Sequence, residues 1–184
     1  MRPPHKDANG AAHPAPWNDA RVHFESVHRF HGSPASVARI LADPGFYRDL
    51  DLPDLSLPEM VENRTEGNDG VVTLRYEFVG HLDPLARALL GGGRLTWVQE
   101  VRVDLRNGSG TLGFRADGDP PRLHGEASFL LVPDGDETVR RLEGDLVVAI
   151  PGVGGMAESR IVPGLLGRLD IEAQALDDRL RTEA

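Results

Sequence analysis

One short motif in the chain has the spacing of a nucleotide-binding loop. The stretch VVAIPGVGGMAE, residues 147–158, contains the pattern Gly-x-Gly-x-x-Ala from Gly152 onward. In a βαβ unit such a loop holds a pyrophosphate, and a second parallel strand must follow the helix. Only 29 of the 184 residues follow Gly155, and their pattern is almost entirely helical. The motif therefore predicts a tight reversal after a strand that Pro151 ends, and not a nucleotide site.

Three histidines are candidates for metal binding or for general-base chemistry. His23 and His28 are five positions apart, so they lie on opposite faces of a strand, and His31 lies beyond the expected strand end. No expected helix carries a His–Glu pair at helical spacing, so the sequence predicts no metal site. A general base needs an acidic partner, and Glu25 points away from His28. The sequence assigns no catalytic residue, and binding is favoured over catalysis.

Polar and aromatic side chains on otherwise apolar strand faces are the candidates for ligand contact. The polar ones either orient a ligand in an apolar cavity or satisfy one another and the backbone, which is the commoner arrangement. The aromatic ones either line a cavity or fill the core, and core packing is the commoner of these two outcomes. The predicted ligand-binding set is Ser26, His28, Tyr76, Trp97, Gln99, Phe114, Phe129, Leu165 and Leu169.

Three arginines on expected strands could receive an anionic group. Arg75, Arg140 and Arg141 alternate with carboxylates along the sequence, however. This alternation is typical of a solvated strand face with surface salt bridges.

The elements that must position these residues follow from the apolar periodicity. RVHFESVHRF alternates as a strand, and Ser33-Pro34 is a typical start of a short helix, with a further helical turn in DPGFYR. From about residue 57 to 150 the chain reads as strands joined by turns such as Asn107-Gly108 and Asp134-Gly135, which predicts antiparallel hairpins. The last segment predicts an amphipathic helix of roughly 25 residues, kinked near Pro163.

Composition limits the class of protein. The net charge of −9 disfavours binding to nucleic acid or to anionic membranes, and the absence of cysteine excludes disulfides and thiolate chemistry. No apolar run approaches the roughly 18 residues that span a bilayer, and no secretory signal is recognisable, so a cytoplasmic location is expected. We expect a disordered, proline-rich tail over residues 1–20 and a single domain over residues 21–184.

The expected order is one strand, two short helices, about six antiparallel strands and a long final helix. This order resembles the helix-grip fold that START lipid-transfer domains, the major birch-pollen allergen and polyketide cyclases share. Within that superfamily (START/Bet v 1-like, SRPBCC) the chain is most similar to the bacterial DUF2505 family. The resemblance covers about residues 22–180 and rests on Val148 with IPGVGGMAE, on Ile161 and Leu165, and on LDPLARALLGG ahead of a strand.

The resemblance implies an α+β fold in which a curved antiparallel sheet wraps around the long C-terminal helix, with a cavity between them. We expect the segment LARALLGGG, residues 85–93, to be either a gate over this cavity or a helical cap on the sheet edge.

The expected function is binding or transport of a small hydrophobic molecule, a lipid or a polyketide-like compound, in that cavity. One alternative is a cyclase-, aromatase- or hydrolase-type enzyme that uses the same cavity. Another is a protein-interaction module with a collapsed cavity, for which a volume well below about 300 Å³ is expected. No cofactor, metal, nucleic acid or integral membrane partner is expected, and a homodimer stays open.

Overall fold

The computed structural model describes residues 20–81, 94–118, 123–149 and 161–183. In these ranges seven strands form one antiparallel sheet in the order β1-β7-β6-β5-β4-β3-β2. The strands are β1 Ala20–His31, β2 Glu59–Glu66, β3 Asp69–Glu77, β4 Thr96–Asp104, β5 Ser109–Ala116, β6 Leu123–Asp134 and β7 Glu137–Val148. The helices are α1 Pro34–Leu41, α2 Pro44–Arg48 and α5 Val162–Glu183.

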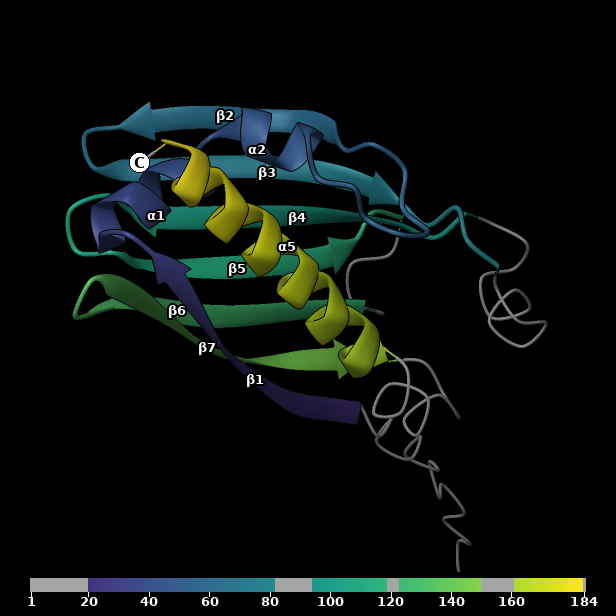
Figure 1. Ribbon diagram of the computed structural model, residues 1–184. Helices are drawn as coiled ribbons and strands as arrows, with labels where there is room; N and C mark the ends of the chain where they lie inside the picture. Colours follow the sequence, from purple (N-terminus) through teal and green to yellow (C-terminus); the bar gives the residue numbers. More distant parts are fainter. Residues whose placement is uncertain (1–19, 82–93, 119–122, 150–160, 184) are drawn as a thin grey trace, which may run out of the picture.

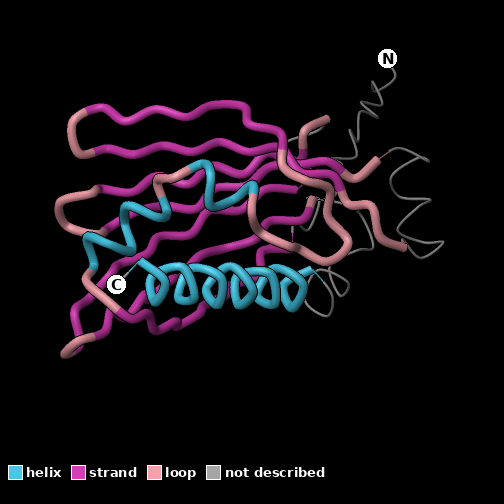
Figure 2. Tube along the Cα trace, turned by 45° about the horizontal axis from the view of Figure 1, so that its top comes forward, coloured by secondary structure: helices cyan, strands magenta, loops and turns pink. Residues whose placement is uncertain are grey.

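The sheet and the last helix form the predicted helix-grip architecture. In Figure 1, α5 runs diagonally across one face of the curved sheet, from the end near β7 to the end near α1. Figure 2 shows that the two short helices lie on the same side of the sheet as α5. The prediction of an α+β fold with a curved antiparallel sheet around the C-terminal helix is confirmed.

The start of the domain forms as its sequence predicts. In β1, Phe24 and Phe30 are buried, whereas Glu25 and Arg29 between them are exposed. The Ser33 hydroxyl accepts a hydrogen bond from the Ser36 amide (3.2 Å) and caps α1, whose first residue is a proline. A serine cap and a proline thus turn the chain from the edge strand into the helices over the sheet.

Glycines close the two predicted hairpins. Gly108 and Gly135 have φ angles of +70° and +66°, a conformation that glycine adopts without a steric cost. Gly108 follows β4 and Gly135 follows β6, so both turn predictions are confirmed.

Two other glycines make room for aromatic rings on the inner face of the sheet. Gly125 lies opposite Phe114, and Gly110 lies opposite Phe129, in the register of β5 and β6. A Cβ atom at either glycine would overlap the facing ring. Glycine inside a strand marks such a close approach, and here it seats both rings against the sheet.

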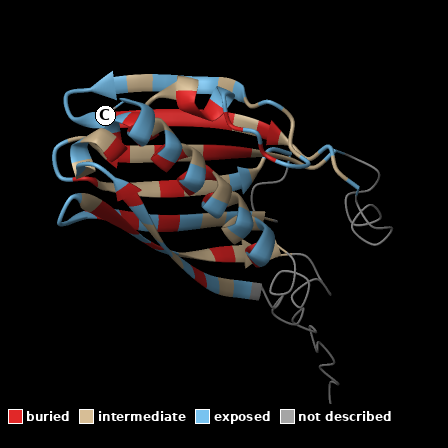
Figure 3. Ribbon diagram, in the orientation of Figure 1, coloured by how far each residue is buried: buried red, intermediate tan, exposed pale blue. Residues whose placement is uncertain are grey.

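Helix α5 packs its apolar stripe on the sheet. Leu169, Ala173, Leu176 and Leu180 are buried in the main hydrophobic core, and Figure 3 shows buried residues along the central strands behind the helix. Pro163 lies in the first turn, where a backbone N–H has no intrahelical partner and proline is tolerated. The amphipathic helix is confirmed, but no described helical turn precedes Pro163 for it to kink.

Several predictions lie outside the described residues. These are the disordered tail up to residue 19, the gate or cap at residues 85–93, and the reversal at residues 151–158. Ala20, which the tail prediction included, is the first residue of β1. Within the described ranges, no helix combines the length and the hydrophobicity needed to cross a bilayer.

Candidate ligand cavity

A cavity of about 480 Å³ lies against the N-terminal half of α5. Helix α5 contributes Gly164, Leu165, Arg168 and Ile171, and Ile161 directly precedes it. These positions recur at three- and four-residue spacing and so share one face. Gly167 also reaches the cavity. Because two of these positions are glycines, the helix fills little of the space in front of it.

The opposite wall comes from the sheet and from the loop after α2. Phe78, Leu95, Trp97, Phe114 and Leu123 lie within two residues of a strand end and line the cavity, together with the loop residues 52–55. The described lining is therefore mostly apolar. Arg168 and Asp54 are its charged members.

Arg168 is held by a stack of aromatic rings. Its guanidinium carbon lies 4.6 Å from the centroid of the Tyr76 ring. Tyr76 in turn stacks on Trp97, with the ring centroids 5.7 Å apart and the planes 20° from parallel, because β3 and β4 pair these residues directly. Burial raises the pKa of Tyr76, so its hydroxyl stays protonated at neutral pH.

The predicted ligand-binding residues divide into three groups. Trp97, Phe114 and Leu165 line the cavity. Tyr76 and Gln99 are each 1% exposed and lie beside the lining: Tyr76 stacks on Trp97, and Gln99 pairs with Phe114 across β4 and β5. The remaining four are not among the described lining residues. Phe129 and Leu169 pack in the hydrophobic core, and Ser26 and His28 lie on β1.

Arg168, Asp54 and Gly164 also line the cavity but were not predicted from the sequence. Arg168 and Gly164 have a recognisable signal, since Arg168 lies three residues after Leu165 and Gly164 lies three residues after Ile161. Asp54 lies in the irregular loop after α2 and has no such periodic signal.

His28 belongs to a polar chain that joins α5 to the sheet. Its Nε2 atom lies 3.0 Å from Oδ1 of Asp170, and Arg140 Nη2 donates to its Nδ1 atom at 3.2 Å. Arg140 Nη1 then donates to Oε1 of Glu172 at 2.9 Å. Because Arg140 can only donate, the neutral imidazole carries its proton on Nε2, facing Asp170.

This chain corrects two predictions from the sequence. His28 does have an acidic neighbour, because Asp170 comes from α5, whose position the alternation within β1 does not reveal. Arg140 is only 2% exposed and does not lie on a solvated face, because β7 directs it under the helix. Arg75 does fit the prediction, since it forms salt bridges with Glu59 (2.9 Å) and Asp117 (3.0 Å).

We expect His28 to make the protein less stable in mild acid. Burial, and then the charge of Arg140, lowers the pKa of His28 below 6.5, although Asp170 and Glu172 act in the opposite direction. Between the lowered pKa and 6.5 the unfolded chain binds more protons than the folded chain. The free energy of unfolding therefore rises with pH across this window, and this contribution is lost on acidification.

Urea unfolding at several pH values between about 5 and 8 measures this effect. The His28→Gln variant is expected to show a flatter pH dependence than the wild type. His23→Gln, at a side chain that is 62% exposed, is the matched control and should keep the wild-type slope. Equal slopes for His28→Gln and the wild type would contradict the assignment.

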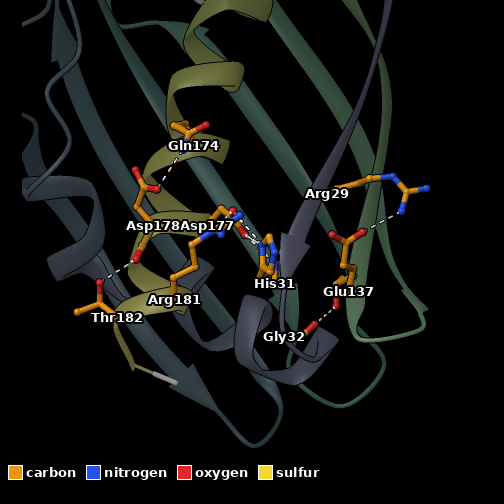
Figure 4. Close-up of polar contacts among 10 residues, drawn as sticks. Arg29, His31, Gly32, Glu137, Gln174, Asp177, Asp178, Arg181 and Thr182 are labelled. Atoms are coloured by element: carbon orange, nitrogen blue, oxygen red, sulfur yellow. Dashed lines mark hydrogen bonds and ion pairs between the residues drawn. The ribbon is translucent and has the colours of Figure 1, made fainter.

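A second polar attachment fixes the C-terminal end of α5 (Figure 4). Asp177 accepts hydrogen bonds from the His31 amide (2.6 Å), from His31 Nδ1 (3.0 Å) and from Arg181 Nε (2.9 Å). Burial alone would raise the pKa of Asp177, but these bonds together hold it below 3.8. These polar attachments of α5 thus begin at Asp170, whereas most of the helix residues that line the cavity precede that position.

No group of three or more His, Asp or Glu side chains within the described ranges is arranged to hold a metal ion. The described walls of the cavity offer apolar side chains, the aromatic stack beside them and the two charged residues Arg168 and Asp54.

Solved structures with this fold include enzymes and a protein of unstated activity. Norcoclaurine synthase from Thalictrum flavum is 18% identical, with a TM-score of 0.63 over 97% of this chain and 98% of that chain. The Zhui aromatase/cyclase from Streptomyces sp. R1128 is 20% identical, with a TM-score of 0.59 over 89% and 98%. A START superfamily protein from Mycobacterium smegmatis is 17% identical, with a TM-score of 0.57 over 88% and 99%. At such low identity these similarities show the fold alone.

Sequence comparison identifies a family but not an activity. No curated protein matches the chain. The family model described as a protein of unknown function (DUF2505) matches residues 25–180, which is most of the chain. The protein therefore belongs to the DUF2505 family and has the START/Bet v 1-like helix-grip fold.

Proposed function

We propose that the protein binds a small hydrophobic molecule in the cavity between α5 and the sheet. The observation that carries this proposal is the cavity itself. Its volume of about 480 Å³ falls within the roughly 300–1,000 Å³ typical of small-molecule sites, and its described walls are mostly apolar. A collapsed cavity, as expected for a pure protein-interaction module, has less support. We place Trp97, Phe114 and Leu165 in direct contact with the ligand and Tyr76 and Gln99 beside them.

Binding has more support than catalysis. The best candidate for acid–base chemistry is His28, but it lies outside the described lining of the cavity, and both of its ring nitrogens are engaged by Asp170 and Arg140. A general base must reach the proton that it removes. The enzymes among the similar structures show that this fold can carry catalysis, but a shared fold does not transfer a reaction.

Titration with phenylnaphthylamine, a neutral fluorescent apolar probe, tests the proposal. We expect one saturable site per chain, and we expect Trp97→Ala to weaken binding about tenfold because it removes a large apolar contact. Leu130→Ser, at a leucine that is 47% exposed on the sheet, is the control for adhesion to the surface and should bind as the wild type does. Non-saturable fluorescence, or a loss of binding in Leu130→Ser alone, would contradict the proposal.

A further inference from the structure

The aromatic stack beside the cavity carries several buried hydrogen-bond donors. Arg168 Nε and Nη2, the Tyr76 hydroxyl and Gln99 Nε2 are all buried without a hydrogen-bond partner among the described residues. Buried donors are normally paired, and an unpaired one is costly. All of these groups can donate, so together they favour a ligand that brings an acceptor.

The charge at this wall is also uncompensated by the described residues. Glu172 lies one turn after Arg168 on α5, but its carboxylate is engaged by the buried guanidinium of Arg140 at 2.9 Å. Asp54 is the carboxylate of the described lining, and it forms no ion pair with Arg168 within the described ranges. A guanidinium in a mostly apolar wall is stabilised most by an anionic oxygen that is also shielded from water, because their hydrogen bond is then charge-assisted.

The Arg168 side chain is prepared for this role. Its guanidinium lies over the ring of Tyr76, which itself rests on Trp97, so ring faces hold the cation in place. This arrangement fixes the guanidinium at the cavity wall while it leaves the Nε and Nη2 edge without a described partner. Those two nitrogens belong to the planar fork that binds a carboxylate in a bidentate manner.

We propose that the ligand is an amphipathic acid: an apolar body that fills the cavity and one anionic oxygen group that Arg168 binds, with the Tyr76 hydroxyl as a further donor. This inference rests on the proposed function, because it assigns chemistry to the ligand of the same cavity. An acidic ligand of this kind differs from neutral hydrocarbons and sterol-like alcohols of similar size, which have no anionic group for Arg168 to bind.

Two probes with the same ring system test the inference. Anilinonaphthalene sulfonate carries an anionic group that phenylnaphthylamine lacks. We expect Arg168→Met to weaken binding of the sulfonate about ten- to a hundredfold more than it changes binding of the neutral probe. Arg168→Lys, which keeps the charge but not the fork, should retain part of the preference for the sulfonate. Arg179→Met is the matched control on the same helix, since Arg179 pairs with Asp43 and Glu183 and does not line the cavity.

The outcomes separate this inference from the proposed function. If the neutral probe binds the wild type, and Arg168→Met and Arg168→Lys change the affinities for both probes by the same factor, the acid-binding role is overturned and the apolar cavity stands. If neither probe shows saturable binding to the wild type, the proposed function fails and the inference fails with it.

Discussion

Replacing Glu172 with alanine is expected to lower the free energy of unfolding by about 3–5 kcal/mol. The side chains of Arg140 and Glu172 are only 2% and 4% exposed, and their ion pair joins β7 to the middle of α5. Removal of the carboxylate leaves the Arg140 guanidinium buried with His28 and the ring of Phe30 as its neighbours. An uncompensated buried charge is among the most costly defects that one substitution can create. Urea unfolding at neutral pH measures the loss.

An exposed ion pair on the same helix provides the control. Glu183→Ala breaks the ion pair between Arg179 and Glu183, whose side chains are 34% and 54% exposed. It should lower the free energy of unfolding by less than about 1 kcal/mol. The double variant Arg140→Met/Glu172→Leu should recover much of the stability lost in Glu172→Ala, since it removes both charges and keeps apolar volume. A loss in Glu172→Ala no greater than that in Glu183→Ala would show that the pair does not hold α5 to the sheet.

Filling the cavity from the helix is expected to abolish ligand binding without unfolding the protein. Gly164 lies on the cavity-facing stripe of α5, and a Cβ atom at this position meets no other atom within 4 Å. In Gly164→Phe the ring is therefore expected to occupy the space of the ligand. Since glycine disfavours a helix by about 1 kcal/mol relative to better helix formers, the variant should be at least as stable as the wild type. Phenylnaphthylamine titration and thermal unfolding measure the two effects.

Two control substitutions test whether the volume of the introduced ring causes the loss of binding: a smaller side chain at the same position, and the same ring at an exposed position. Gly164→Ala should keep the affinity for the probe, because a methyl group fills little of about 480 Å³. Gln174→Phe places the same ring on an exposed position of α5 and should bind as the wild type does. Wild-type affinity in Gly164→Phe would place the ligand elsewhere.

Local periodicity predicted the elements and several of the cavity residues. The alternation of Val72, Leu74 and Tyr76 and the three- and four-residue spacing of Leu165, Leu169 and Leu176 depend only on neighbouring positions in the chain. Turn residues such as Gly108 and Gly135 are equally local. These signals were sufficient for the order of elements and for including Trp97, Phe114 and Leu165, which line the cavity, among the candidate ligand contacts.

The polar architecture depended on tertiary placement and was not predictable in this way. Arg140 alternates with carboxylates in the sequence, and only the crossing of α5 over β7 makes it a buried partner of Glu172. Asp170 and His28 are more than a hundred residues apart, so no local pattern joins them. Arg168 was missed because a charged residue at the edge of an amphipathic stripe normally faces solvent. Here this part of the helix faces a cavity, and the guanidinium of Arg168 lies against the aromatic stack in the cavity wall.

Methyl-group NMR of the complex with phenylnaphthylamine tests the central claim most directly. If the cavity under the first turns of α5 is the binding site, intermolecular NOEs should connect the probe to the methyl groups of Leu165, Ile171 and Leu123, which line it from the helix and the sheet. NOEs confined to Val27 and Leu130, which are exposed on the sheet, would contradict the claim. They would show that the probe adheres to the surface and that the protein takes no ligand between its sheet and its last helix.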